Sequence, residues 1–248
     1  MKKNRKILII SFVVSVCVVA ILCFYIINDS NDNSTSTTTL SSGEQTTNGE
    51  DVTTYRVAFF DSAGYLLKEE QVEEYKGVEP PSDFVPDADK IFMGWDKDFS
   101  YIFSNINVRP NYLDISSDKN YVYANAVYAK PGDEVKVRVK IGGQVCIAAL
   151  QININYDETL LEYVDSVNLD NGVMVNKVEN ESNIRLAFLS NDNATGSVDF
   201  VDIIFKVKGT TGDKAVIMYD VEDAAQINSN NDIVVADYTV KDTVIHIY

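Results

Sequence analysis

The sequence contains little of the chemistry on which most catalytic and metal sites depend. Its 248 residues include one histidine, one tryptophan and three cysteines. Two of these cysteines fall inside an apolar run near the N-terminus, so Cys146 is the one cysteine elsewhere and no disulfide can form within that larger part of the chain. The fold must therefore be stabilised by a hydrophobic core. A secreted chain that avoids cysteine is typical of bacterial surface proteins.

The residues that remain do not assemble into a catalytic motif. His246, the single histidine, lies in an apolar stretch near the C-terminus, where a packed or edge position is more common than a catalytic base. The sequence has no phosphate-binding loop and no dinucleotide fingerprint. Carboxylates are plentiful, but no pair stands out for glycoside hydrolysis, and the acids cluster in expected turns. We therefore expect a protein that is not an enzyme and that carries no cofactor.

Basic residues are also few, at 21 lysines and arginines against 37 aspartates and glutamates, which gives a formal net charge of −16. Four of the basic residues precede the first acid of the chain, so the remainder is more acidic still. Such a surface repels nucleic acid and anionic lipid head groups. These charges argue against a polynucleotide ligand.

Calcium-binding loops of the helix–loop–helix type are absent as well. Two segments rich in Asn and Asp, at 190–199 and 228–233, resemble such loops only in composition. Neither has the alternating oxygen ligands, the glycine and the final glutamate at the required spacing. Asn and Asp are frequent turn formers, so we interpret both segments as turns and expect no metal site.

One long hydrophobic run is present, at 7–27, and it is interrupted only by two serines. About 20 apolar residues cross a bilayer. Basic residues flank only the N-terminal side, which predicts a cytoplasmic tail and a transmembrane signal anchor at 1–28, with the rest outside. A cleaved signal ending at Val18-Val19-Ala20 is the alternative, although the run is longer than a usual signal core. We expect a single-pass protein of the cell membrane, in a Gram-positive bacterium.

The segment that follows, 29–54, is rich in Ser and Thr and has almost nothing that could bury apolar area. This composition predicts a disordered, solvated linker. Its function would be to hold the following domains away from the membrane.

A small β module is expected at 55–113. Strands are predicted at 55–60 and 65–72, around a turn that Gly64 closes with a positive φ. Two more are predicted at 91–95 and 106–112, after an irregular crossing that three prolines enforce. Trp95 is expected to fill the core of this module rather than to contact a sugar.

This segment resembles the Listeria–Bacteroides repeat of internalin-type surface proteins. The resemblance rests on "VAFFDSAGYLL", "VEEYKGVEPP", "FMGWDKDFSYI" and "INVRPNY". It implies a small β-grasp-like fold that acts as a spacer or adhesive unit, with no catalytic residues.

The C-terminal part, 114–248, is predicted to be a two-layer antiparallel β-sandwich, so the whole protein is expected to be all-β apart from its anchor. "EVKVRVKI" at 134–141 alternates strictly between apolar and charged residues, as a half-buried strand does, before two glycines break it. A short helix or turn is expected at 157–162. Further strands are predicted at 122–128, 149–155, 173–178, 184–189, 198–207, 215–219 and 240–247.

This part resembles a cohesin, the receptor module that captures dockerins in cellulosomes. The matching stretches, in the family's order, are "AKPGDEVKVRVKI", "ALQININYDETLLEYV", "NIRLAFLSNDNATG", "VDIIFKVKG" and "YDVEDAAQINSNNDIVV…TVIHIY". Glu158 stands where the family usually has proline. The resemblance implies a jelly-roll sandwich of about nine strands, from about 120 to 248. It also implies that one sheet face binds a dockerin helix pair, with the calcium carried by the dockerin.

The resemblance places candidate binding residues on that face. Gln151 and Asn153 can hydrogen-bond to a partner without the cost of desolvating a full charge. The contact set of type I cohesins is not reproduced, which implies a different partner specificity or a loss of dockerin binding. A plain solvated sheet face is the alternative. The residues expected at this face are Ala149, Gln151, Asn153, Phe188, Asn191, Thr195 and Val235.

The sequence thus predicts a non-catalytic, membrane-anchored, cell-surface cohesin. It would bind dockerin-bearing proteins, such as polysaccharide-degrading enzymes, in a cellulosome-like assembly. A surface adhesin is one alternative. Another is a carbohydrate-binding module that contacts polysaccharide through exposed aromatic residues, the candidates being Tyr121, Tyr123, Tyr128 and Tyr238.

Overall fold

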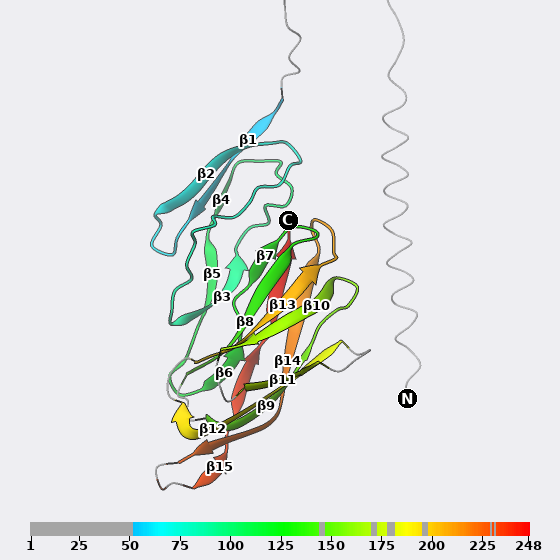
Figure 1. Ribbon diagram of the computed structural model, residues 1–248. Helices are drawn as coiled ribbons and strands as arrows, with labels where there is room; N and C mark the ends of the chain where they lie inside the picture. Colours follow the sequence, from blue (N-terminus) through cyan, green and yellow to red (C-terminus); the bar gives the residue numbers. More distant parts are fainter. Residues whose placement is uncertain are drawn as a thin grey trace, which may run out of the picture. The chain divides into compact units, whose positions relative to one another are not determined.

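The computed structural model describes residues 52–143, 147–169, 173–177, 182–194, 198–228, 230 and 232–248, of which 173–177 and 190–194 are described by their backbone alone. These residues form seventeen β-strands and no helix (Figure 1). Within this part of the chain, no helix has the length and hydropathy needed to cross a membrane. The expected anchor at 7–27 and the linker up to residue 51 lie outside the described residues.

The first part of the described chain forms a small module of two sheets. Strand β1 (Thr54–Phe60) pairs antiparallel with β2 (Leu66–Glu73) and parallel with β4 (Ile106–Val108). A separate two-stranded sheet joins β3 (Lys90–Trp95) to β5 (Pro110–Asp114). The central sheet is mixed, and β3 and β5 form a separate sheet.

The single strand expected at 106–112 is wrong, because the chain breaks at Arg109 and its halves join different sheets. The Arg109 N–H donates to Asp96 Oδ1 at 2.7 Å, and the Arg109 carbonyl accepts the Asp96 N–H at 2.8 Å. Pro110 follows and has no N–H to extend the ladder of β4. The chain is therefore redirected here towards β3.

An aromatic cluster forms the core of the small module. Trp95 is only 8% exposed. Its ring lies edge-on to Phe59 at 5.2 Å and to Phe92 at 5.7 Å, and Phe59 in turn contacts Phe99 at 5.1 Å. The prediction that Trp95 fills this core is confirmed. Gly64 adopts φ 92° in the β1–β2 turn, also as predicted.

The second part is the expected sandwich of two sheets. The five-stranded sheet has the order β10 (Leu161–Asn168), β13 (Val198–Val207), β8 (Glu134–Gly143), β6 (Asn120–Tyr123) and β16 (Tyr238–Lys241). The seven-stranded sheet has the order β11 (Val173–Lys177), β12 (Asn183–Ala194), β9 (Ile147–Asn155), β14 (Lys214–Ile227), β17 (Thr243–Ile247) and β7 (Val127–Ala129), with β15 (Ile233–Val235) paired to β14. Neighbouring strands are antiparallel except β16–β6 and β17–β7, which are parallel.

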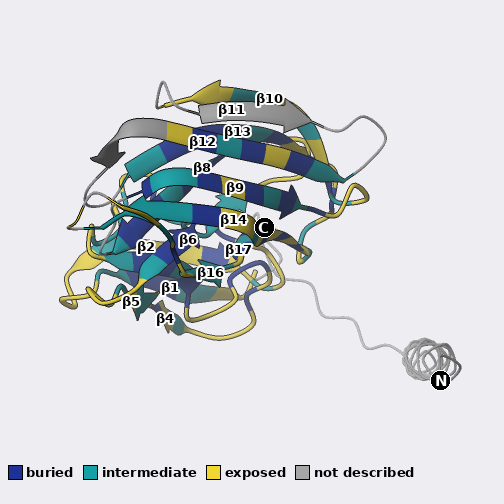
Figure 2. Ribbon diagram, turned by 90° about the horizontal axis from the view of Figure 1, so that it is seen from below, coloured by how far each residue is buried: buried dark blue, intermediate teal, exposed yellow. Residues whose placement is uncertain are grey.

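Alternation along the strands builds the core between the two sheets. In β8, Val135, Val137, Val139 and Ile141 are buried, as predicted, and Figure 2 shows the same banding along β12 and β9. The expected break at the two glycines is wrong, since β8 continues through Gly143. Glycine is needed there because φ is 100° and a Cβ would collide with the carbonyl of Lys119.

Two strands expected as single segments, at 122–128 and 240–247, each divide between the sheets. The first becomes β6 and β7, and the second becomes β16 and β17. The crossings are held together by Thr243, whose hydroxyl donates to the Ala124 carbonyl at 3.1 Å and hydrogen-bonds Tyr219 Oη at 2.8 Å. This division contributes to a total of twelve strands between Asn120 and Ile247 among the described residues, rather than about nine.

The segment at 157–162 is a turn and not a helix. The Leu161 N–H donates to the Asp157 carbonyl at 2.9 Å, and the Asp157 carboxylate accepts the Thr159 N–H at 2.8 Å. Strand β10 begins directly afterwards at Leu161. The turn passes the chain from β9 in the seven-stranded sheet to β10 in the five-stranded sheet.

The small module packs directly onto the sandwich. Tyr121 and Tyr123 flank the core residue Val122 in β6, so their rings point away from the sandwich core, yet both are buried in one cluster with Ile91 of β3. Phe92 also donates its N–H to Asn125 Oδ1 at 3.0 Å. Burial excludes Tyr121 and Tyr123 from an exposed sugar-binding strip. The module and the sandwich form one packed unit.

Candidate binding face

Strand β9 lies in the middle of the seven-stranded sheet and presents a polar outer face. Leu150 and Ile152 point into the core and are buried. Between and beside them, Ala149, Gln151 and Asn153 point outward, with Gln151 exposed and the other two half-buried. These three side chains lie on the outer face, as expected from the alternation.

The strands on either side of β9 extend this face into rows. Gln151 lies between Ala187 of β12 and Asp223 of β14 in the strand register. The next row places Asn153 between Arg185 and Asp220. We call the exposed charges of these rows, Arg185, Asp220, Glu222 and Asp223, together with Gln151 and Asn153, the acidic band.

Glu222 is the residue that organises the acidic band. The register of β14 against β9 shifts between Val221 and Asp223, so Glu222 is the extra residue of a β-bulge. Its carboxylate accepts hydrogen bonds from the side-chain amides of both Gln151 and Asn153. The two amides therefore fix the position of a carboxylate on the face. Sequence reasoning missed Glu222, although two adjacent acids that break the alternation of β14 are a bulge signal.

An apolar strip borders the acidic band. Leu189 of β12 is 61% exposed and Val235 of β15 is 82% exposed. The register joins them through Ala149 and Ala225 into one row, and Ile233 lies exposed beside Val235 in the same strand. Exposed aliphatic side chains in a row beside ordered charges are typical of a surface that another protein covers.

Not all of the residues expected at this face lie on it. The expectation for Phe188 is wrong, because Phe188 is 3% exposed and packs edge-on against Phe200 at 4.8 Å inside the core. Its neighbour Leu189 takes the exposed position. Asn191 lies within β12, but its side chain is not described, and Thr195 lies outside the described residues.

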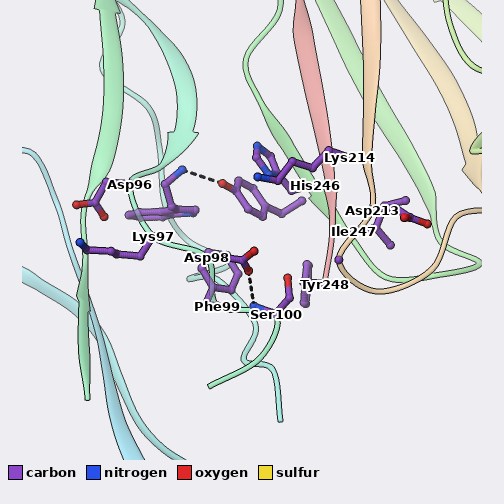
Figure 3. Close-up of a pocket in the computed structure, with 13 residues that line it drawn as sticks. Asp96, Lys97, Asp98, Phe99, Ser100, Asp213, Lys214, His246, Ile247 and Tyr248 are labelled. Carbon is purple, nitrogen blue, oxygen red and sulfur yellow. Dashed lines mark hydrogen bonds between the residues drawn. The ribbon is translucent and has the colours of Figure 1, made fainter. Parts of the chain in front are cut away.

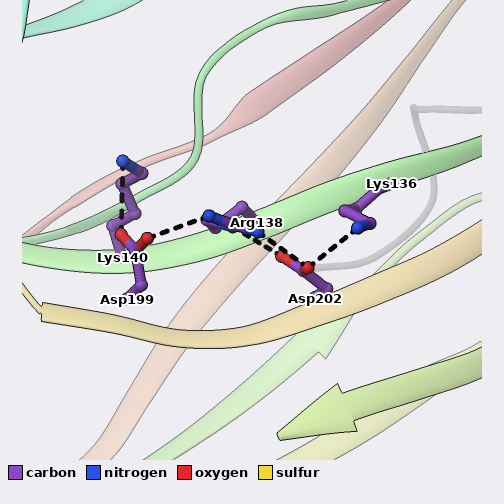
Figure 4. A network of polar contacts seen from close by, with 5 residues as sticks. All are labelled: Lys136, Arg138, Lys140, Asp199 and Asp202. Carbon is purple, nitrogen blue, oxygen red and sulfur yellow. Dashed lines mark hydrogen bonds and ion pairs between the residues drawn. The ribbon is translucent and has the colours of Figure 1, made fainter. Parts of the chain in front are cut away.

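The outer face of the five-stranded sheet has a different character. Asp202 is 3% exposed at its side chain and accepts two hydrogen bonds from Arg138, at 2.7 and 2.9 Å (Figure 4). Lys136 lies 3.2 Å from the same carboxylate, and Asp199 pairs with Arg138 and Lys140. The hydrogen bond from Arg138 holds the pKa of Asp202 below its usual value. These charges pair with one another, and the small module packs against β6 of the same sheet. This face is therefore less open to a partner.

His246 lies in a small pocket between the module and the sandwich, with a volume of about 130 Å³ (Figure 3). Its ring stacks on that of Tyr128, with 4.6 Å between the ring centroids, and the Tyr128 hydroxyl accepts the backbone N–H of Trp95 at 2.7 Å. Burial lowers the pKa of His246 to about 4, so the imidazole is neutral at pH 7. The residue is packed, as expected.

The sequence also predicts no metal site. Across the described ranges, no cluster of three or more His, Cys, Asp or Glu side chains could hold a metal ion. In the loop at 228–233, Asn228 Oδ1 accepts the N–H groups of Asn230 and Asp232, each at 2.9 Å. These hydrogen bonds from Asn230 and Asp232 to Asn228 are of the kind that Asn accepts in turns. In the other Asn-rich segment, 190–199, the expected turn is wrong for the described residues, because 190–194 belong to strand β12 and 198–199 to strand β13.

Comparisons with known proteins give one family match. A family model described as "Cohesin domain" matches residues 122–246, half of the 248-residue chain. No curated protein matches.

Solved structures that this chain is similar to include the seventh ScaB type I cohesin from Pseudobacteroides cellulosolvens, at 19% identity and a TM-score of 0.48, over 52% of this chain and 92% of that one. The sixth cohesin of scaffoldin B from Acetivibrio cellulolyticus, solved in complex with a Cel5 dockerin mutant, has 22% identity and a TM-score of 0.45, over 52% and 99%. A non-cellulosomal cohesin from the archaeon Archaeoglobus fulgidus has 16% identity and a TM-score of 0.44, over 52% and 91%.

Proposed function

This chain belongs to the cohesin family, and from that membership we propose that its seven-stranded sheet is a docking face for a dockerin-bearing protein. Cohesins are non-catalytic binding modules, which agrees with the composition of the sequence. The observation that carries the proposal is that the acidic band and the apolar strip lie side by side on one open sheet face. Within the band, Gln151 and Asn153 hold the carboxylate of Glu222 in place without a partner.

The face suits a partner that is both basic and apolar. The acidic band contains Asp220, Glu222 and Asp223 against the single cation Arg185, so it has an excess of negative charge. Rows along a strand are two residues, or about 6.6 Å, apart. Four residues of an α-helix rise about 6 Å. A helix lying along β9 with an apolar side chain on the apolar strip would therefore place a basic side chain of its next turn on the acidic band.

The arrangement of Glu222 would reduce the cost of binding. Gln151 and Asn153 already hold its carboxylate, so a partner need not order that side chain on arrival. The five-stranded sheet offers a partner less open surface, since the small module covers β6 and the neighbouring charges are paired with one another. These observations support the seven-stranded side as the proposed position of a docking partner.

The remainder of the proposal rests on the sequence. The apolar run at 7–27 would anchor the chain in the bacterial cell membrane and the Ser/Thr-rich linker would give reach. The small module would act as a Listeria–Bacteroides-type repeat. A docked polysaccharide-degrading enzyme would then be concentrated at the cell surface, with calcium bound by its dockerin.

The test is a binding screen of residues 52–248 against every dockerin encoded in the same genome, with calcium and with a chelator. We expect at least one dockerin to bind in calcium and to dissociate on chelation, measured by calorimetry. The proposed function fails if no dockerin binds under either condition.

A further inference from the structure

A groove crosses the junction of the module and the sandwich, away from the docking face. It has a volume of about 450 Å³, within the range of small-ligand sites. Tyrosines from both parts of the protein line it, namely Tyr75, Tyr101 and Tyr248. As whole residues, Tyr75 and Tyr101 are 67% and 52% exposed. Large aromatic side chains left open to water beside a groove are a feature of binding sites.

Backbone contacts hold the loop of Tyr75 against the loop that contains Tyr101. Tyr75 has φ 65°, the one positive value among the described residues that are not glycine. Its N–H donates to the Ile102 carbonyl at 2.6 Å, and the Ile102 N–H donates to the Lys76 carbonyl at 2.9 Å. A Cβ on Gly77 would lie 2.6 Å from the Ser100 carbonyl oxygen, so the two loops are in close contact. Backbone strain of this kind persists only where the surroundings enforce it, and it is common at ligand sites.

The structural contacts of Tyr101 do not account for its position. Its hydroxyl donates to the Thr211 carbonyl at 3.5 Å, which is long for a hydrogen bond, and the residue stays about half exposed to water. A side chain kept only for packing would be buried. The ring is better explained as a surface on which a ligand lies.

The polar groups of the groove indicate the class of ligand. Lys130 of the sandwich forms an ion pair with Glu79 of the module, and Lys76 adds one further cation. The groove therefore offers hydrogen-bond donors and acceptors next to flat apolar rings, with little net charge. A pyranose ring has the matching form, because its C–H face is apolar and its rim carries hydroxyl groups. A polyanionic chain would be repelled by the overall charge of −16.

We propose that this groove binds a neutral polysaccharide, with sugar rings stacked on Tyr75 and Tyr101. The site is independent of the proposed dockerin face. It also replaces the sugar-binding strip suggested by the sequence, in which Tyr121 and Tyr123 are buried.

The test is affinity gel electrophoresis of residues 52–248 in gels containing barley β-glucan, xyloglucan, glucomannan or xylan. We expect at least one polymer to retard the protein, and Tyr75→Asn and Tyr101→Ala each to lower the association constant at least tenfold. Asparagine tolerates the backbone conformation of Tyr75, so that variant removes the ring without new strain. The matched control is Tyr65→Ala, since Tyr65 is a 74% exposed tyrosine of the same module outside the groove.

Three results would overturn the proposal. The first is that none of the four polymers retards the protein, and the second is that Tyr65→Ala weakens binding as much as the groove variants. The third is that a proline decamer, whose rings also stack on tyrosine, binds at the groove while the polysaccharides do not. Dockerin binding by the groove variants should remain unchanged, which separates this test from that of the docking face.

Discussion

Glu222 of β14 links two strands of the docking face, because its carboxylate accepts hydrogen bonds from the side-chain amides of Gln151 and Asn153 in β9. A carboxylate held by two neutral donors keeps its full charge and can accept a further hydrogen bond from a cation. It is thus the residue whose charge should matter most to a basic partner.

Reversing that charge gives the first prediction. Glu222→Lys should weaken dockerin binding about 10- to 100-fold, since the new ammonium repels a basic partner and leaves the two amides without their acceptor. Glu222→Gln should have a smaller effect. Calorimetry measures both, with Glu158→Lys, an exposed acid in the turn before β10, as control. Equal affinities for the Glu222 and Glu158 variants would show that the partner binds elsewhere.

His246 gives a prediction about acid stability. Its folded pKa of about 4 lies below the ordinary value of 6.5, so the unfolded chain binds a proton more readily between these values. The stabilising contribution is complete above pH 6.5 and is lost as the pH falls towards 4. Because the ring is partly exposed, we expect a loss on the order of 1–2 kcal/mol.

The variant His246→Phe keeps an aromatic ring against Tyr128 and has no proton to bind. Urea unfolding at pH 7 and pH 4 should show a smaller decrease in the free energy of unfolding for this variant than for the parent. The carboxylates common to both proteins cancel in that comparison. An identical decrease would mean that His246 is as accessible to protons in the folded protein as in the unfolded chain.

At the scale of the strand, the alternation of apolar and polar residues predicts which side chains face the core. It does not predict which sheet a strand joins. The inward and outward residues of β8 and β9 follow from period two, which depends only on the local backbone. The division of 122–128 between two sheets depends on partners more than 100 residues away, such as Thr243 with Ala124. The local pattern contains no such information, so the sequence predicts one strand where the structure has two.

The same distinction applies to the binding face. Gln151 and Asn153 could be placed from their own strand. Phe188 is assigned to the face by resemblance, although the apolar residues Leu186 and Ile184, two and four positions before it, indicate that it faces the core. Glu222 lies beside Gln151 only through a bulge, which requires the pairing of β14 with β9.

Gly143 gives a prediction at this scale. Gly143→Ala should destabilise the protein by about 2–4 kcal/mol, because the new methyl group meets the Lys119 carbonyl and φ is positive. Gly132→Ala is the matched control: φ there is 88°, but a Cβ would have open space. It should cost only the backbone strain, about 1 kcal/mol. Chemical denaturation compares the two, and equal losses would exclude a steric effect at Gly143.

For the whole molecule, the small module is a structural partner of the cohesin and not a detached spacer. Ile91 is fully buried among residues of both parts, and Tyr128 stacks on Phe99 of the module at 5.3 Å. The sequence predicts two β segments, at 55–113 and 114–248. It gave no sign of this contact, because the tyrosines that make it were read as candidates for a sugar-binding strip.

Truncation tests this packing. Residues 120–248 alone would expose the rings of Tyr121, Tyr123 and Tyr128, so we expect that fragment to aggregate or to melt well below residues 52–248. The longer protein should unfold in one transition. Size-exclusion chromatography and calorimetry measure both properties. A monomeric fragment with an unchanged melting temperature would show that the contact contributes no stability.

The parallel pairing of β16 with β6 and of β17 with β7 has a mechanical consequence. The strands through which the chain enters the sandwich run beside the strands that end it. A pull applied between the two ends of residues 52–248 would load each ladder in shear, with its hydrogen bonds resisting together instead of breaking one by one. We expect single-molecule stretching of residues 52–248 to show one abrupt high-force rupture, whereas gradual low-force unravelling would contradict this.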